Sequence, residues 1–337
     1  MKAELISGKE RVKNALAHKT TARPPVAYNG AEPQLAAKIH SHYGVPDELS
    51  MWLKMGLDFW PIEPSKPPAP VKSRQEQWAA EKEHPLQHAQ SIREIEAYFR
   101  EAASPPEIDY TSFVSEKKNE HADKFRFISG GSLFEAAWHV RGFSTLLEDF
   151  YLNPELADTL IEHFLQGSLS RTESLLQAFQ GTMDMVFLGD DLGAQRGLIF
   201  SVDIFRKFFK PRLRKMIELA HRHKAVVVMH SCGSVAELIP EFIDVGLDIL
   251  NPVQISADGM DPSRLKGEFG QDITFWGGVD IQTVLREQTP KQIRKTVRFL
   301  IETLGTDGGY ICAPTHVVLD DTPLENLIAF FEEALRV

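Results

Sequence analysis

Short apolar runs alternate with longer amphipathic segments along the whole chain. Each run has four to six residues, and helix-length segments separate most of them. This alternation is typical of buried parallel strands in successive βα units. Eight units match a closed (β/α)8 barrel, so we predict an α/β protein with a single TIM barrel over residues 1–337 and an N-terminal helical extension. The predicted strands are residues 25–29, 57–62, 125–129, 184–188, 225–230, 248–251, 273–276 and 309–312.

Two of the segments between the strands carry the same signal for the start of a helix. Thr289 precedes Pro290, and Gln292 follows two residues later. A threonine at the N-cap with Gln or Glu three residues on forms a capping box, and proline suits the first helical position. Thr322 and Pro323 repeat this arrangement. We therefore predict helices that begin at residues 290 and 323.

Residues 64–122 differ from the rest of the chain. They are rich in Pro, Glu, Lys and Gln and contain few apolar runs. We interpret this segment as an insertion after the second strand, partly helical and partly loop. The alternative is a linker between two domains.

Composition excludes several classes of protein. The net charge is −10 without a basic block, which argues against a nucleic-acid partner. No apolar stretch is long enough to span a membrane, and the first residues lack the apolar core of a signal peptide. Two cysteines do not make a disulfide framework. We expect a cytoplasmic protein whose thiols can bind metal.

The carboxyl ends of the predicted strands carry the candidate chemistry, because functional groups of a TIM barrel collect there. Asp190 and Asp191 are adjacent, so we expect one of them to face the barrel mouth and the other to cap a helix or to pair with Arg196. The catalytic candidates are Asp190, Asp280 and His316. The candidates for substrate binding are Asn29, Asp191, Gln195, Asn251, Trp276 and Asp280.

His230 and Cys232 end the fifth predicted strand and are two residues apart. Side chains at this spacing point to the same side of a strand, and imidazole with thiolate is a donor set that suits zinc. The alternative is a buried pair without metal. His316, just beyond the last strand, is favoured as third ligand over Cys312, which lies inside an apolar run. A hydrogen-bonding His316 without metal stays open.

Five stretches of the chain resemble a known family. They are residues 129–135, 189–195, 230–234, 276–280 and 313–316. The sequence resembles the uroporphyrinogen decarboxylase superfamily and, within it, the cobalamin-linked methyltransferase branch. That branch includes methylcobalamin:coenzyme M methyltransferases and corrinoid-dependent demethylation enzymes.

The resemblance implies a zinc enzyme that moves a methyl group between a small substrate and a corrinoid. His230 and Cys232 match the branch's His-x-Cys zinc ligands, whereas His316 stands where the branch has a third cysteine. The chain lacks an Asp-x-His-x-x-Gly sequence, so a methylcobalamin or other corrinoid would reside on a separate carrier protein. The methyl donor or acceptor would be a small molecule.

The decarboxylase branch fits the sequence less well. Its arginine-rich N-terminal segment corresponds to residues 28–33, which contain no arginine. Its essential carboxylate corresponds to Ser65, and its third-strand tyrosine to Trp138. A negatively charged chain without that arginine cluster is poorly suited to a polyanionic porphyrinogen. The alternatives are another lyase or hydrolase, decarboxylase-like enzymes included, with Asp190, Asp280 or His316 as acid or base, and a metal-free binding relative.

Overall fold

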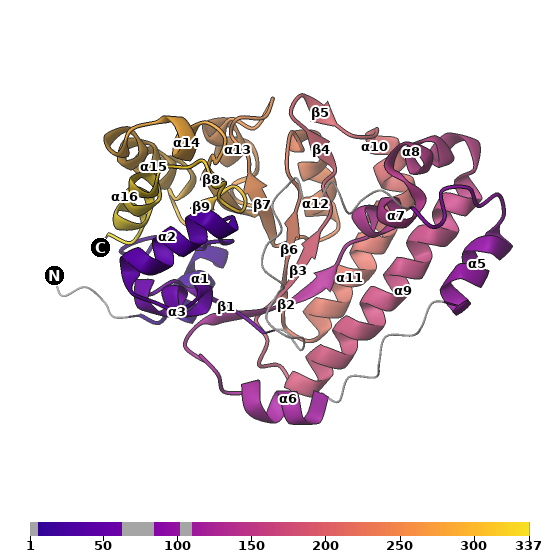
Figure 1. The fold of residues 1–337 in the computed structure, drawn as a ribbon, viewed down its shortest axis with the longest axis horizontal. Helices are drawn as coiled ribbons and strands as arrows, with labels where there is room; N and C mark the ends of the chain where they lie inside the picture. The colour runs from indigo at the N-terminus through magenta and orange to yellow at the C-terminus, as the bar shows by residue number, and fades with distance from the viewer. Residues whose placement is uncertain (1–5, 63–83, 102–109, 337) are drawn as a thin grey trace.

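A curled parallel β-sheet with helices around it forms the molecule (Figure 1). The computed structural model describes residues 6–62, 84–101 and 110–336. Seven strands pair side by side in the order β1-β2-β3-β6-β7-β8-β9. They are β1 Phe59–Pro61, β2 Phe125–Gly131, β3 Met185–Gly189, β6 Val226–His230, β7 Ile249–Val253, β8 Thr274–Val279 and β9 Tyr310–Pro314. Each coincides with a predicted strand, so seven of the eight predictions are confirmed.

The first predicted strand, residues 25–29, is not a regular strand. Val26 makes one isolated parallel bridge to Cys312 of β9. Cys312 N donates to the Pro25 carbonyl at 2.8 Å, and Asp58 N donates to the Val26 carbonyl at 3.3 Å. The segment therefore bonds both to β9 and to the residue before β1. Pro25 supplies no N–H for a ladder, so the pairing with β9 cannot extend toward the N-terminus from this bridge.

Alternate residues of the strands face two separate cores. The interior core contains Phe59, Val228, Ile249, Trp276 and Ile311, among others. The residues between them face the helices and join a larger outer core. The two-residue period of a strand explains this division, which decides the side on which each site residue can act.

Helices cover the outer face of the sheet (Figure 1). α9 packs against β2, α11 against β6, and α15 against β8 and β9. No helix in the described part of the chain is long and apolar enough to cross a membrane. The helices are α1 Gly8–Leu16, α2 Pro33–Tyr43, α3 Glu48–Met55, α5 Ile92–Glu101, α6 Tyr110–Lys117, α7 Phe134–Arg141, α8 Phe143–Leu152, α9 Pro154–Phe179, α10 Val202–Ile204, α11 Lys210–Arg222, α12 Ile239–Asp244, α13 Pro262–Phe269, α14 Val284–Glu287, α15 Pro290–Leu304 and α16 Leu324–Ala334, with a π-helical turn at Phe205–Phe209 and a 3-10 turn at Ala236–Leu238.

One of the two predicted helix starts is confirmed. Thr289 and Gln292 form the predicted capping box at the start of α15. α16 begins one residue later than predicted, with Pro323 at the N-cap in an extended conformation (ψ 131°). Thr322 is therefore one position too early to cap the helix. Its hydroxyl is buried and has no hydrogen-bond partner among the described residues.

Two helices lie within the predicted insertion, residues 64–122. Phe99 of α5 stacks on His163 of α9 at 3.5 Å between ring centroids, and Phe113 of α6 contacts Phe179 edge-on at 5.8 Å. Both helices thus pack on α9. Residues 64–83 and 102–109, which include Ser65, lie outside the described residues, and the insertion itself remains a prediction.

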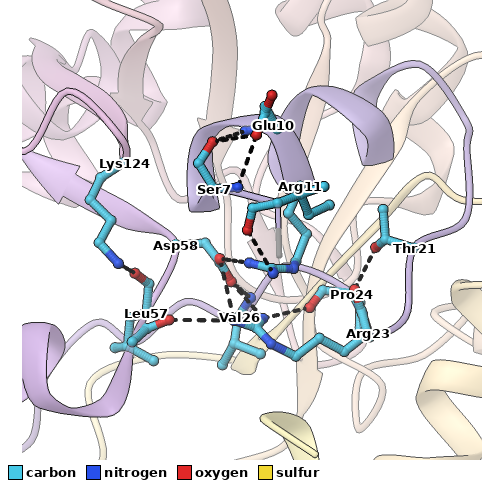
Figure 2. A network of polar contacts seen from close by, with 12 residues as sticks. Ser7, Glu10, Arg11, Thr21, Arg23, Pro24, Val26, Leu57, Asp58 and Lys124 are labelled. Carbon is cyan, nitrogen blue, oxygen red and sulfur yellow. Dashed lines mark hydrogen bonds and ion pairs between the residues drawn. The ribbon is translucent and has the colours of Figure 1, made fainter. Parts of the chain in front are cut away.

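A buried ion cluster joins the N-terminal helix to the start of β1 (Figure 2). Asp58 is fully buried, and its carboxylate contacts Arg11 at 2.5 Å and Arg23 at 2.7 Å. It also accepts from Val26 N at 2.8 Å. Val12 of α1 adds its side chain to the interior core. This end of the sheet, where the strands begin, is held by charge pairing and packing.

Candidate metal centre

Three predicted ligands come together where the strands end. His230 is the last residue of β6, Cys232 follows two residues later, and His316 follows β9. One ligand atom from each lies within 4.8 Å of the other two. Cys232 Sγ is 3.4 Å from His230 Nε2. Ligands of a tetrahedral zinc are separated by roughly 3.5 Å, given Zn–S and Zn–N bonds of about 2.3 and 2.1 Å. The donor types fit zinc, and the spacing of Cys232 and His230 matches that of two zinc ligands.

Cys312 lies on the opposite side of its strand. It is fully buried in the outer core, whereas its neighbour Ile311 belongs to the interior core. Burial raises the pKa of the Cys312 thiol to about 12. Metals bind the thiolate, so this cysteine is poorly suited to be a ligand. The structure brings His316, and not Cys312, to His230 and Cys232.

Asn251 holds the ring of His230. The two residues are paired across β6 and β7, and Asn251 Oδ1 lies 2.6 Å from His230 Nδ1. Asn251 is fully buried. The sequence predicted it as a substrate contact, which remains a prediction, and the structure places its amide oxygen against the candidate ligand His230.

Asp190 and Asp191 face different ways, as the sequence predicted. Asp190 is buried and accepts from Leu133 N and Glu135 N, both at 2.8 Å. It therefore caps α7, because Leu133 at the N-cap has no polar side chain of its own. Burial raises the pKa of Asp190 to about 8, which outweighs the lowering by these N–H groups. Asp191 accepts from Cys232 N at 2.8 Å, so its carboxylate supports the metal ligands.

Asp191 also faces His230 directly. Its Oδ1 is 3.6 Å from His230 Nε2, and about two fifths of its side chain is exposed (39%). Glu135, which the sequence analysis did not single out, joins this group. Burial raises the pKa of Glu135, and the charge of Asp191 raises it further. Its carboxylate accepts a hydrogen bond from the Asp191 backbone. Two local signals point to Glu135, its place at the end of the stretch 129–135 that resembles the family and its place in the first turn of α7, just after β2.

A hydrogen-bonded network connects four loops beside Cys232. Gln254 Oε1 accepts from Gly233 N at 2.8 Å, and Gln254 Nε2 donates to Gln195 Oε1 at 3.2 Å. Gln254 Nε2 also reaches Ser256 Oγ at 3.4 Å, and Ser256 Oγ donates to Asp280 Oδ2 at 2.7 Å. Two residues predicted to contact substrate, Gln195 and Asp280, are thus joined to the metal loop through Gln254.

The other oxygen of Asp280 closes its own turn. Oδ1 accepts from Gln282 N at 3.0 Å, from Thr283 N at 2.7 Å and from Thr283 Oγ1 at 2.9 Å. Asp280 is 1% exposed. The structure therefore shows what holds Asp280, while its predicted role toward a substrate remains a prediction.

Trp276 lies deeper in the interior core than the metal ligands. Its ring stacks on Phe59 at 4.6 Å and meets Phe187 edge-on at 6.2 Å, and Phe187 lies 6.1 Å from the His230 ring. The indole N–H is buried and finds no acceptor in the described part of the chain. Phe187 thus contacts both Trp276 and the candidate ligand His230.

Asn29 lies near the loop that carries His316. The next residue, Gly30, accepts a hydrogen bond from Val318 N at 2.9 Å, two residues beyond His316. Asn29 is partly exposed. This predicted substrate residue therefore lies at the same end of the sheet as the candidate ligands, where the strands finish.

The chemical capacity of the site follows from these groups. Three N and S donors can hold a zinc ion and leave one coordination position for a small molecule. Two carboxylates, Asp191 and Glu135, stand beside the ligands and can exchange protons or bind polar groups.

Comparison with known proteins gives a family and a fold. A family model described as uroporphyrinogen decarboxylase (URO-D) matches residues 82–337. Among solved structures, the chain is similar to a methyltransferase from Methanosarcina mazei, with a TM-score of 0.70, 17% identity and 98% of each chain covered. It is also similar to a xylose isomerase-like TIM barrel protein from Mycobacterium smegmatis in complex with magnesium. That similarity has a TM-score of 0.40 and 15% identity, and covers 93% of this chain and 97% of the other. No curated protein matches the sequence. At 17% identity the first likeness establishes the fold alone.

Proposed function

Because the chain belongs to the uroporphyrinogen decarboxylase family, we propose that it is a zinc-dependent methyltransferase that moves a methyl group between a small substrate and a corrinoid on a separate protein. The observation that carries this proposal is the convergence of His230, Cys232 and His316 within 4.8 Å. A His/Cys/His set with an open position is the arrangement of a catalytic zinc site. On this proposal the sheet and residues 25–29 together form a complete barrel that opens at these ligands.

The three ligands decide what chemistry the site supports. When bound there, zinc would lower the pKa of a thiol or hydroxyl on a small substrate, or polarise a methoxy oxygen. His316 in place of a third cysteine leaves the ligand set with one thiolate less, and therefore less negative. This set would activate an electron-rich nucleophile more weakly than His/Cys/Cys.

The residues around the ligands would orient the substrate. Asp191 and Glu135 place negative charge beside the open position, which disfavours an anionic substrate and favours hydroxyl or amine groups. The network from Gln195 to Asp280 would hold the loops that surround the substrate. The corrinoid would come from a carrier protein that covers the same end of the sheet, because the chain has no Asp-x-His-x-x-Gly sequence.

Metal analysis tests the ligand set. We expect near-stoichiometric zinc in the wild-type protein and in Cys312→Ser, and loss of zinc in Cys232→Ser and His316→Ala. Cys312→Ser is the matched control, because it removes a thiol from the outer core. Zinc retained in Cys232→Ser, or lost in Cys312→Ser but not in His316→Ala, would overturn the assignment.

Transfer of a methyl group from free methylcobalamin to small thiols, and from methoxy compounds to reduced cobalamin, tests the reaction class. We expect turnover in one direction that depends on zinc and on Cys232. A protein that binds zinc and shows no transfer in either direction would contradict the methyltransferase proposal while it leaves the metal site standing.

The second candidate is another lyase or hydrolase of the same family, decarboxylase-like enzymes included. The pKa of Glu135 favours it, because burial and the charge of Asp191 raise that pKa, and a raised pKa is what a carboxyl needs to act as a general acid. Glu135→Gln separates the candidates. An acid–base enzyme should lose most of its turnover in this variant, whereas methyl transfer should lose affinity for substrate more than its maximal rate.

A further inference from the structure

The contact between Asn251 and His230 decides which nitrogen of the histidine is available to a metal. Asn251 Oδ1 is 2.6 Å from His230 Nδ1, on the edge of the ring away from Cys232. An amide oxygen only accepts hydrogen bonds, so this contact requires a proton on Nδ1. Neutral imidazole has one N–H, so Nε2 then keeps its lone pair. Nε2 is the atom that faces Cys232 Sγ at 3.4 Å.

The backbone around Asn251 holds this contact in place. Asn251 pairs with His230 in the register of β6 and β7, and its carbonyl accepts from Ser231 N at 2.6 Å. The side chain is fully buried. Its amide nitrogen has no hydrogen-bond partner within residues 6–62, 84–101 and 110–336, so the oxygen carries the bonding of this side chain. A buried amide whose backbone is paired with β6 at this position cannot follow a rotation of the ring without the loss of this bond.

We propose that Asn251 is a positioning residue that sets the tautomer of His230, so that Nε2 and not Nδ1 is presented to zinc together with Cys232 and His316. The inference rests on the proposed function only in that His230 is taken as a zinc ligand. Asn251, which the sequence marked as a substrate contact, acts in this proposal through the histidine. An uncharged acceptor orients the ring but increases its basicity less than a carboxylate would.

The tautomer can be measured on the full chain without metal. Selective ¹⁵N labelling of histidine and long-range ¹H–¹⁵N NMR distinguish protonated from unprotonated ring nitrogens. The chain has 12 histidines, so the His230 signals are assigned as those that disappear in His230→Gln. At about pH 8.5, where neutral imidazole predominates, we expect His230 to carry its proton on Nδ1. A proton on Nε2 in the wild type would overturn the proposal, because the amide would then be the donor.

Two substitutions of Asn251 give opposite expectations. Asn251→Asp keeps an acceptor, so it should keep the Nδ1–H tautomer and bind zinc at least as tightly as the wild type. Asn251→Leu has the same number and branching of side-chain heavy atoms and no acceptor, so the tautomer should no longer be fixed and zinc affinity should fall about tenfold in chelator competition. An unchanged tautomer in Asn251→Leu, or weaker zinc binding in Asn251→Asp, would contradict the role.

Ser231→Ala is the matched control. Ser231 is buried beside the same ligand, but its hydroxyl accepts from Leu192 N at 2.9 Å and does not contact the ring. This variant should keep the tautomer and stay within about threefold of wild-type zinc affinity. An effect as large as that of Asn251→Leu would show that packing, rather than the hydrogen bond, is responsible. If wild-type protein binds no zinc, the proposed function fails, while the NMR result still decides the role of Asn251.

Discussion

At the scale of the residue, two neighbouring aspartates of this site have different environments and therefore different roles. Asp190 is buried and receives the N–H groups at the start of α7, whereas Asp191 is partly exposed beside His230. Their separation follows from the alternation of a strand. The buried member has a pKa of about 8, which makes the stability of the protein depend on pH.

We expect the contribution of Asp190 to the free energy of unfolding to decrease as the pH rises. Its ordinary pKa of 3.8 applies to the unfolded chain, and its pKa of about 8 to the folded protein. Between these values the folded protein retains a proton that the unfolded chain has released. The contribution of Asp190 to the free energy of unfolding therefore falls from about pH 4 to about pH 8 and is constant above, with a slope of at most about 1.4 kcal/mol per pH unit.

Urea unfolding from pH 5 to pH 8 measures this effect. Asp190→Asn should show a flatter dependence on pH than the wild type. Asp203→Asn, at a carboxylate that is 89% exposed, serves as control and should keep the wild-type slope. Equal slopes for all three proteins would mean that Asp190 is ionised in the folded state.

The carboxylate of Asp280 belongs to the same scale. Asp280→Asn should retain zinc, because Asp280 contacts the metal loop only through Ser256 and Gln254. It should lower the free energy of unfolding by about 1–3 kcal/mol, because the amide keeps one oxygen for Gln282 and Thr283 but its NH2 group cannot accept the hydrogen bond from Ser256 Oγ. It should also reduce turnover if Asp280 contributes to the substrate pocket. Elemental analysis, denaturation and methyl-transfer rates measure the three effects, and loss of zinc would place Asp280 among the ligands.

At the scale of the element, a small hairpin packs against the loop that carries Cys232. β4 Gly193–Ala194 and β5 Gly197–Leu198 pair antiparallel just after β3. A Cβ on Gly193 would lie 2.7 Å from the Cys232 carbonyl oxygen, and Ser234 N donates to the Ala194 carbonyl at 2.8 Å. The hairpin therefore packs directly on the backbone that carries the thiol ligand.

Gly193→Ala tests this packing. The added methyl group should displace the Cys232 backbone and lower zinc affinity about tenfold or more, because metal ligands tolerate little displacement. Gly197→Ala is the matched control, since a Cβ there meets nothing within 4 Å, and it should bind zinc like the wild type. Chelator competition measures the affinity. Equal affinities in the two variants would show that the hairpin does not position Cys232.

At the scale of the whole molecule, the buried ion cluster around Asp58 and the candidate metal site lie at opposite ends of the sheet. Asp58 and its arginines stand where β1 begins (Figure 2), and the candidate metal ligands stand where β6 and β9 end. This division is usual in barrels of this kind, in which loops after the strands carry function and the other end carries stability.

Asp58→Asn should therefore weaken the fold without removing the metal site. The change leaves Arg11 and Arg23 without their buried counter-charge, which costs about 3–5 kcal/mol. Chemical denaturation should show this loss, while zinc content measured below the transition stays at the wild-type value. Cys232→Ser should show the reverse, with zinc lost and most of the stability kept. If Asp58→Asn lost zinc while still folded, the two ends would be coupled.

The sequence by itself determined those features that depend only on residues close together in the chain. Seven strands were predicted from their apolar runs. A strand that is buried on both faces of a sheet needs apolar side chains at successive positions, and this gives a continuous apolar run of a few residues. The pairing of His230 with Cys232 and the divergence of Asp190 from Asp191 follow from the two-residue period of a strand. The complete barrel and the insertion at residues 64–122 remain predictions.

The tertiary structure decided everything that depends on how distant strands meet. His316 reaches the ligand pair and Cys312 does not, because the side chain at position 312 faces the outer core. Glu135 meets Asp191, and Asn251 meets His230, only because separate βα units are adjacent in the sheet. The hydrogen bonds that hold the Asp280 carboxylate, to its own loop and to Ser256, also come from the tertiary structure, while its role in a substrate pocket remains a prediction. Sequence spacing fixes directions along one strand, whereas contacts between strands depend on register and on loop conformation, which no local pattern encodes.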